Sequence, residues 1–405
     1  MATHLRFILF PLLALASVTV SGAQSLQGQI DATPAGGTLR LPAGLYAGPV
    51  VISKPVTVDG RGQATLDGGG TGTVITIRGV GTIVRGLHIV NSGDLHDQTD
   101  AAILIEGDGN VIENNVMVNV LFGVVLQQAS GNVVRANRIR SRHRDPADRG
   151  DAVRLWYSFG NRIADNDIAD ARDISLISSQ RNRITGNAVR NGRTGLHMIF
   201  AGRTLIEGNT FSHNSGGIFA LNSEGLIIRD NRILHATSAS GSGIGLKETS
   251  SALIEGNDIV HCGVGILADS PTHPVNRIVI IDNHIAHCLT GIVFYGEKGG
   301  HIVHRNRFEH NLSHAVTGGF GDALANDWYG NYWDDYGGFD RNHDGVGDTP
   351  YELYAYSDRI WMGEPKAKFF NNTPLMELID FLEHLAPFSA PDLILRDPAP
   401  RAHRR

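Results

Sequence analysis

One pattern recurs through most of the chain: an asparagine, an apolar residue two positions later and, in most copies, a glycine-apolar pair eight positions on. The copies follow at intervals of about 22 residues, and the longer intervals contain insertions such as RSRHRDPADRGD and ATSASGSG. The asparagines that mark the copies are Asn115, Asn137, Asn166, Asn187, Asn209, Asn231, Asn257, Asn283 and Asn306. Each copy reads as short alternating strands between turns, without apolar residues at helical spacing.

A single copy of this kind cannot bury its apolar face, but successive copies can bury it by stacking. The pattern therefore predicts an all-β protein, a right-handed parallel β-helix over residues 24–318 built from coils of about 22 residues. Equivalent residues of adjacent coils would lie about 4.8 Å apart, so stacked asparagine side chains could hydrogen-bond along the rod.

The repeat is absent from both ends of the chain. Residues 36–68 are β-rich but aperiodic, which is typical of the first, capping coils of a solenoid. Residues 319–405 are predicted to form an irregular C-terminal extension with a short amphipathic helix over residues 374–386. Its apolar stripe is Leu375, Leu378, Ile379, Leu382 and Leu385, after Thr373 as N-cap and Pro374 in the first turn.

The first residues have the pattern of a secretory leader. Arg6 precedes an apolar run from residue 7 to residue 20, and Ser21-Gly22-Ala23 supplies the small residues that a signal peptidase requires. We expect a signal peptide at residues 1–23, cleavage after Ala23 and a periplasmic mature protein. The net charge of −6 argues against nucleic acid as a partner, because phosphate binding needs a concentrated basic face.

An acidic loop near the C-terminus alternates oxygen donors in the manner of a calcium site. Asp340, Asn342, Asp344 and Asp348 occupy positions 1, 3, 5 and 9, Gly345 permits the sharp turn, and Val346 would offer its carbonyl oxygen. The usual glutamate at position 12 is replaced by Tyr351. An ordinary turn rich in aspartate is the alternative, and in both cases the role would be structural.

Softer metal ligands recur with the repeat. Five histidines, each four residues after the asparagine of its copy, would stack into an imidazole ladder suited to copper or zinc, or would form a solvated row without a ligand. They are His213, His235, His261, His287 and His310. Cys262 and Cys288, one coil apart, could form a disulfide, remain buried thiols or bind a soft metal. His197 and Met198 are further copper candidates, although neighbours in a strand face opposite ways.

A second class of function is suggested by the segment NSGDLHDQTD. It gathers Asp94, His96, Asp97 and Asp100, which could form the acid–base centre of a polyuronate epimerase or lyase, and DLHD is similar to a motif of β-helical alginate epimerases. A charged loop rim is the alternative. A purely structural or adhesive solenoid is a third hypothesis.

Several stretches resemble the NosD family, the periplasmic maturation proteins of nitrous oxide reductase. They are GDAVRLWYSFGNRI, GLHMIF, SGIGLKETSSALIEGN, GNYWDDYGGFDRNHDGVGDTPYEL, DRIWM and DFLEHLAPFSAP. The resemblance extends from about residue 30 to residue 400, and the stretch after the repeat is its most specific part.

The resemblance implies a β-helical protein without catalytic activity. It would dock on an ABC transporter made of the NosF ATPase and the NosY permease, receive copper from the NosL chaperone, and help to build the copper-sulfide centre of nitrous oxide reductase. Copper would be transient cargo, and calcium a possible structural ion. Family members often carry a methionine two residues after the histidine of GLHMIF; here Met198 follows His197 directly and Ile199 fills that place.

Overall fold

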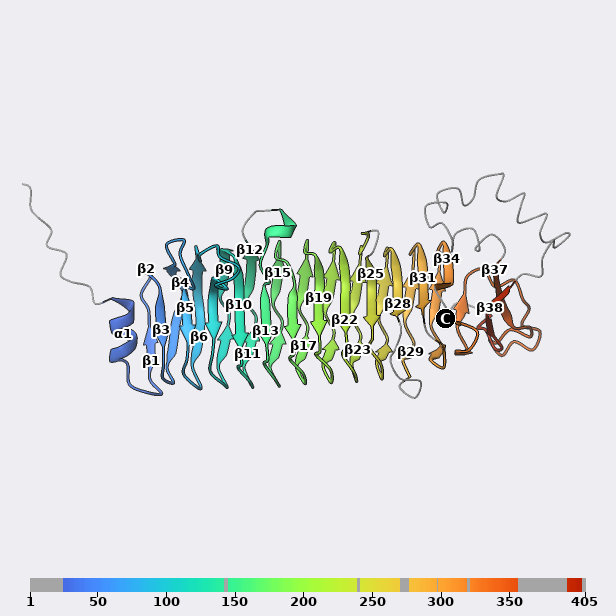
Figure 1. The fold of residues 1–405 in the computed structure, drawn as a ribbon, viewed down its shortest axis with the longest axis horizontal. Helices are drawn as coiled ribbons and strands as arrows, with labels where there is room; N and C mark the ends of the chain where they lie inside the picture. Colours follow the sequence, from blue (N-terminus) through green and yellow to red (C-terminus); the bar gives the residue numbers. More distant parts are fainter. Residues whose placement is uncertain are drawn as a thin grey trace, which may run out of the picture.

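The computed structural model describes residues 25–141, 145–238, 241–269, 277–296, 298–318, 321–355 and 392–402. The predicted signal peptide and the predicted helix at 374–386 lie outside the described residues. The described chain winds into a rod of stacked coils along its long axis (Figure 1). Within the described residues, all pairings between coils are parallel, which confirms the predicted parallel β-helix, and the one antiparallel pair of strands belongs to the C-terminal extension.

Two parallel sheets form the wall of the rod. Each coil contributes one strand to a 12-stranded sheet and, in most coils, two shorter strands to a 24-stranded sheet that bends between them. The strands of the 12-stranded sheet are β3 (Val50–Ile52), β5 (Ile75–Ile77), β7 (Ala101–Ile105), β10 (Phe122–Gln127), β13 (Val153–Trp156), β16 (Ile174–Ile177), β19 (Thr194–Ile199), β22 (Gly216–Leu221), β25 (Ser242–Lys247), β28 (Val264–Asp269), β31 (Thr290–Tyr295) and β34 (Ser313–Gly318).

The 24-stranded sheet runs from the first coil to the last. In its N-terminal half the strands are β1 (Thr38–Arg40), β2 (Gly44–Ala47), β4 (Thr57–Asp67), β6 (Ile83–Val90), β8 (Val111–Glu113), β9 (Val116–Val120), β11 (Val133–Arg135), β12 (Arg138–Ser141), β14 (Arg162–Ala164), β15 (Asp167–Ala169), β17 (Arg183–Thr185) and β18 (Ala188–Arg190). In its C-terminal half they are β20 (Leu205–Glu207), β21 (Thr210–Ser212), β23 (Ile227–Arg229), β24 (Arg232–Leu234), β26 (Leu253–Glu255), β27 (Asp258–Val260), β29 (Val279–Ile281), β30 (His284–Ala286), β32 (Ile302–His304), β33 (Arg307–Glu309), β35 (Asp327–Tyr329) and β36 (Tyr332–Trp333).

The core lies inside the rod and is built from aliphatic ladders. Ile206 of β20 pairs in register with Ile184 below and Ile228 above, and all three are 0% exposed. Because side chains alternate along a strand, the residues on either side of each buried isoleucine face outward. Burying one such side chain contributes about 1.5–3 kcal/mol, so the ladders are the main source of stability.

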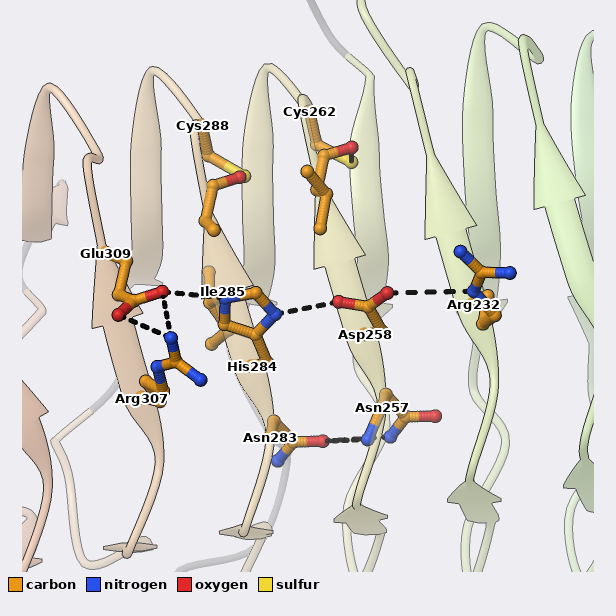
Figure 2. Close-up of polar contacts among 12 residues, drawn as sticks. Arg232, Asn257, Asp258, Cys262, Asn283, His284, Ile285, Cys288, Arg307 and Glu309 are labelled. Carbon is orange, nitrogen blue, oxygen red and sulfur yellow. Dashed lines mark hydrogen bonds and ion pairs between the residues drawn. The ribbon is translucent and has the colours of Figure 1, made fainter. Parts of the chain in front are cut away.

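The asparagines that mark the repeat form a buried hydrogen-bonded ladder, as the sequence predicts. In a representative step, the backbone N–H of Asn257 donates to Oδ1 of Asn283 over 3.0 Å, and its Nδ2 donates to the same oxygen over 2.9 Å (Figure 2). Nδ2 also donates to the carbonyl oxygen of Ile228 on the preceding coil over 2.9 Å. This asparagine ladder continues to Asn331, one coil beyond the last asparagine of the sequence pattern.

The N-terminal end of the rod is covered by a short helix that the sequence analysis does not predict. This helix, α1 (Leu26–Ala32), begins after Ser25, whose Oγ accepts a hydrogen bond from the Gly28 N–H over 3.2 Å. Leu26 and Ile30 are buried against the first coils, and the Gln27 side chain exchanges hydrogen bonds with the backbone of Val51 in β3. In Figure 1, α1 lies across the open end of the first coil.

The C-terminal end differs from the prediction in its boundary. The parallel ladder does not stop at residue 318, because β35 and β36 pair with β32 and β33 and complete another coil. In this coil, Trp328 and Trp333 occupy inward-facing positions that aliphatic residues hold in most other coils. The repeat is therefore not recognisable in the sequence. Beyond them, β37 (Tyr351–Ala355) and β38 (Asp392–Asp397) form an antiparallel pair at the far end of the rod (Figure 1). Among the described residues, no helix has the length and apolar character needed to cross a bilayer.

Candidate metal centre

Five histidine side chains form a single stacked row along one corner of the rod, as the repeat predicts. The row, called the histidine ladder below, consists of His213, His235, His261, His287 and His310. Successive ring centroids are 4.6, 5.0, 4.9 and 5.1 Å apart. The ladder lies at the surface, and only His235 is as much as half-buried.

The ladder occupies a corner where the backbone turns left-handed. Its five residues have φ values of 52–58°, a conformation that among residues with a side chain favours asparagine, aspartate and histidine. The preceding coils place Asp170 and Asn191 at the same corner, with φ of 54° and 58°. The corner therefore accepts asparagine in place of histidine, which provides a conservative substitution for testing the ladder.

Within the ladder, the surroundings of His235 favour its neutral form. Burial and the neighbouring imidazoles His213 and His261 lower the pKa of His235 below its ordinary value, because a charged ring in the middle of the row would face two others. A neutral imidazole has a free nitrogen lone pair and can bind a metal ion. The last member differs, because Nδ1 of His310 lies 2.8 Å from a carboxylate oxygen of Asp334.

The spacing of the rings suits shared but loose metal binding. An ion bound by two imidazoles lies about 2.0 Å from each nitrogen, so the two nitrogens must come within about 4 Å. Stacked rings at 4.6–5.1 Å reach that separation by tilting toward each other, which exposed side chains can do. Several equivalent pairs in a row would give an ion alternative positions of similar affinity.

Cys262 and Cys288 lie directly behind the ladder. They are the residues after His261 and His287, their side chains are 3% exposed, and both are free thiols on adjacent coils (Figure 2). The hydrogen bond between the two thiols lowers the pKa of Cys262 and, together with burial, raises that of Cys288. Ionisation of one thiol therefore opposes ionisation of the other.

His197 and Met198 are adjacent in β19 but do not meet. Met198 is 0% exposed inside the rod, whereas His197 lies on the outer face and stacks on Phe219 with ring centroids 5.5 Å apart. Burial lowers the pKa of His197, while the Asp173 carboxylate opposes that shift. The two side chains therefore do not form one ligand pair, and their assignment to copper stays a prediction.

A buried network of charged side chains lies beside His197 and is not apparent from the sequence. Asp151 is 1% exposed, and its two oxygens lie 2.7 Å from Arg154 Nε and 2.8 Å from Arg172 Nε. Asp173 is paired with Arg193 in the same way. An adjoining pocket of about 160 Å³ is lined by Arg193, Thr194, Ser215, Phe219, Ser238 and Ser242, among others. Asp151 and Asp173 precede the paired strands β13 and β16 on adjacent coils, a register that only the fold reveals.

The proposed acid–base cluster is spread along a loop. Asp100 is 3% exposed and accepts a hydrogen bond from the backbone N–H of Leu95 over 3.0 Å, so it braces the loop. Nε2 of His96 lies 3.0 Å from the carbonyl oxygen of Asp148, and its ring packs edge-on against Phe122. Asp97 is exposed. This arrangement favours the alternative interpretation of a charged loop rim.

The calcium-type loop is closed by its own hydrogen bonds. The carboxylate of Asp340 accepts from the N–H groups of Asp344 and Gly345, over 3.2 and 2.9 Å, and Asp344 accepts from Val346 over 2.8 Å. Gly345 has a φ of 87°, so a side chain there would strain the turn.

The remaining ligands of the loop follow the same pattern. Asn342 Oδ1 accepts from Asp344 N–H over 3.1 Å, and Asp348 accepts from Arg341 N–H over 2.9 Å. Within the described part of the chain, the three loop aspartates do not bring their oxygens within 4.8 Å of one another. Calcium binding would therefore require these turns to rearrange, and it stays a prediction.

Comparison with known proteins identifies related chains. Residues 140–338 match the family model NosD, described as "Periplasmic copper-binding protein (NosD)". A "Probable ABC transporter binding protein NosD" of Pseudomonas aeruginosa is 26% identical, with 93% of this chain and 91% of that protein covered. The protein of the same name from Stutzerimonas stutzeri is also 26% identical, with 86% and 83% covered.

Solved structures show the same fold in enzymes. The A-module of a mannuronan C-5 epimerase from Azotobacter vinelandii superposes with a TM-score of 0.55 at 14% identity, covering 74% of this chain and 93% of that chain. A PL6 alginate lyase in complex with a trisaccharide has a TM-score of 0.50 at 15% identity, covering 76% and 81%. At such identities the likeness concerns the fold alone.

Proposed function

Because this chain belongs to the NosD family, we propose that it is the periplasmic component of an ABC-transporter-linked system that delivers copper and matures the copper-sulfide centre of nitrous oxide reductase. Its partners in this role are the NosF/NosY transporter at the inner membrane, the NosL copper chaperone and nitrous oxide reductase. A signal peptide at residues 1–23 directs the chain to the periplasm. The role includes no catalytic step.

The histidine ladder is the observation that carries this proposal. It presents five imidazoles in one row at the surface, and one of its inner members, His235, has a lowered pKa. Imidazole is a good ligand for copper. An exposed row of imidazoles does not enclose the ion, so the ion can both bind and dissociate. Copper is the cargo, and it occupies successive ring pairs rather than a fixed centre.

Copper titration of the mature, tag-free protein tests the ladder. In the ladder variant, the four histidines that do not touch Asp334 are changed to asparagine, which the same corner already accepts at Asn191. The changes are His213→Asn, His235→Asn, His261→Asn and His287→Asn. Competition with a chromophoric Cu(I) chelator should show binding by the wild type that falls at least tenfold in the ladder variant, because the shared ligands are gone.

Two single variants separate the sites in this titration. His88→Asn removes an exposed imidazole outside the ladder and should leave binding unchanged. His197→Ala, which leaves the ladder intact, tests the second predicted site. A loss of copper binding in this variant would indicate that the cargo site is on β19. Equal copper binding by the ladder variant and the wild type would refute the ladder as the cargo site.

The biological role is tested in cells that lack the native family member. Complementation with this chain should restore a nitrous oxide reductase that contains its copper-sulfide centre, and the ladder variant should restore less. A strain that makes the complete centre without any copy of the protein would exclude the proposed role.

The alternative function, a polyuronate epimerase or lyase, rests on the loop of Asp94, His96 and Asp97. The geometry of that loop does not favour it, because His96 is engaged by a backbone carbonyl. Incubation with alginate is a direct check. Unsaturated products absorbing in the ultraviolet, or a change in uronate epimer content by NMR, would support the enzyme instead of the copper carrier.

A further inference from the structure

The last coil holds a cluster of side chains that lies outside the calcium-type loop and adjoins the end of the ladder through the contact of Asp334 with His310. His314, at the start of β34, meets Asp334 and Asp335, which follow β36. Nε2 of His314 lies 3.0 Å from Oδ1 of Asp334 and 3.3 Å from Oδ1 of Asp335. The ligand atoms of the three residues all lie within 4.8 Å of one another, and in the described part of the chain no other group of three does so.

Both carboxylates are oriented toward the imidazole by other groups. Oδ2 of Asp334 accepts hydrogen bonds from the backbone N–H of His310 and lies 2.8 Å from its Nδ1. Oδ2 of Asp335 accepts a hydrogen bond from the Tyr351 hydroxyl over 3.1 Å. Each aspartate therefore has one oxygen held from behind while the other points at His314, which is how outer groups usually orient metal ligands.

Among the described residues, the imidazole has no other polar partner. The His314 side chain is 6% exposed, its Nδ1 is buried without a hydrogen bond, and its ring packs edge-on against Phe308 and Trp333. A single hydrogen on Nε2 cannot donate well to two carboxylates at once. Two negative groups thus converge on one nitrogen, and a cation between the three atoms would satisfy all of them.

We propose that His314, Asp334 and Asp335 form a binding site for a divalent cation of the zinc class. One borderline imidazole nitrogen and two hard carboxylate oxygens suit Zn²⁺, which accepts both kinds of ligand, better than Ca²⁺, which takes oxygen ligands alone, or Cu(I), which prefers soft ligands. Ligand atoms on a tetrahedral zinc ion lie about 3.4 Å apart, since each is about 2.1 Å from the ion. The two nitrogen–oxygen distances of 3.0 and 3.3 Å are close to that value, and the two carboxylate oxygens lie within 4.8 Å of each other.

Three protein ligands leave one tetrahedral position open for water or for a donor from a partner. The ion would also fasten the extension to the solenoid, because its ligands come from β34 and from the segment after β36, while Tyr351 of β37 orients one of them. The predicted effect of the ion is therefore on both binding and stability. The proposal does not depend on copper transport.

Zinc titration in the ladder variant isolates the site, because that variant lacks the other imidazole pairs. Isothermal titration of the metal-stripped mature protein with ZnCl₂ should give one ion per chain. Asp335→Asn keeps the shape of the side chain and should weaken binding at least tenfold by removing one charged ligand. Asp327→Asn is the matched control, because Asp327 pairs with His304 over 3.1 Å on the same coils but has no second carboxylate beside it.

A second measurement separates metal binding from a purely structural ion-pair cluster. Zinc should raise the melting temperature of the ladder variant and of its Asp327→Asn derivative, but not of its Asp335→Asn derivative. Co²⁺ should give visible absorption bands that Asp335→Asn removes. Absence of stoichiometric zinc binding in the ladder variant, or equal binding and equal stabilisation with and without Asp335→Asn, would overturn the proposal.

Discussion

Asp397 of β38 ends the asparagine ladder after Asn331, the last asparagine of the ladder in the described part of the chain. Its carboxylate accepts hydrogen bonds from the backbone N–H and Nδ2 of Asn331, both over 2.9 Å, and from Trp333 Nε1 over 3.3 Å. Gly330 and Ala399 donate to its other oxygen. Its side chain is 0% exposed. One residue from the extension therefore accepts the hydrogen bonds that an asparagine of a further coil would otherwise accept.

Asp397→Ala should therefore lower the free energy of unfolding by about 3–5 kcal/mol, because it leaves several buried donors without acceptors. Urea unfolding followed by circular dichroism measures the change. Glu224→Gln, at an exposed position, is the control and should remain within about 0.5 kcal/mol of the wild type. A difference of less than 1 kcal/mol between the two variants would show that the cap is not needed.

At the same scale, the buried thiols predict a specific labelling result. Cys262 and Cys288 are 3% exposed and free, so a maleimide should not react with the folded protein and should add to both after unfolding. Mass spectrometry of the unreduced protein gives the number of maleimide labels per chain before and after unfolding. Absence of label after unfolding, with label appearing only after a reductant, would indicate a disulfide instead.

At the scale of the element, the histidine ladder should bind copper in a pH-dependent way. A protonated imidazole cannot bind a metal, and an ordinary histidine has a pKa of about 6.5. The pKa of His235 is lowered, so in the folded protein this ring stays neutral to a lower pH than an ordinary histidine. Copper affinity should be constant above about pH 7 and fall below about pH 6.

The contribution of His235 can be separated by a single substitution. His235→Asn should shift the fall in copper affinity to a higher pH, because the ring with the lowered pKa is gone. Chelator competition over a pH series measures this shift, with His88→Asn as the control. A profile that does not depend on pH between 5 and 8 would mean that imidazoles are not the ligands.

The calcium-type loop gives a second prediction for an element. Ca²⁺ should raise the melting temperature of the metal-stripped protein by a few degrees, since binding to the folded state alone stabilises it. Asp344→Asn should abolish the rise, because it removes a charged ligand but can keep the hydrogen bond to Val346 N–H. Equal shifts with Mg²⁺, or in the variant, would indicate that the loop is only a braced turn.

At the scale of the whole molecule, the rod depends on covered ends. A solenoid with an open end exposes apolar side chains and unpaired strand edges, which promote association. The double variant Leu26→Ser/Ile30→Ser removes the two buried side chains by which α1 covers the first coil. It should form dimers or larger species by size-exclusion chromatography with light scattering, whereas Ala32→Ser, at an exposed position of α1, should not. A monomeric double variant would show that α1 is dispensable.

The sequence by itself determined the architecture. A repeat of about 22 residues with alternating apolar positions has few ways to bury its apolar face other than stacking, so the parallel β-helix, the asparagine ladder and the histidine ladder follow from spacing alone. Equivalent positions become neighbours in space because every coil has the same shape.

Only the tertiary structure decided how the ends close and where unrelated segments meet. Asp397 reaches Asn331, and His314 meets Asp334 and Asp335, across stretches of sequence that show no period. The opposite faces of His197 and Met198 are set by the strand, but the partners of each side chain are set by packing against the next coil. Contacts between repeated positions can be deduced from their spacing, whereas contacts between a repeat and a non-repeating segment depend on the whole fold.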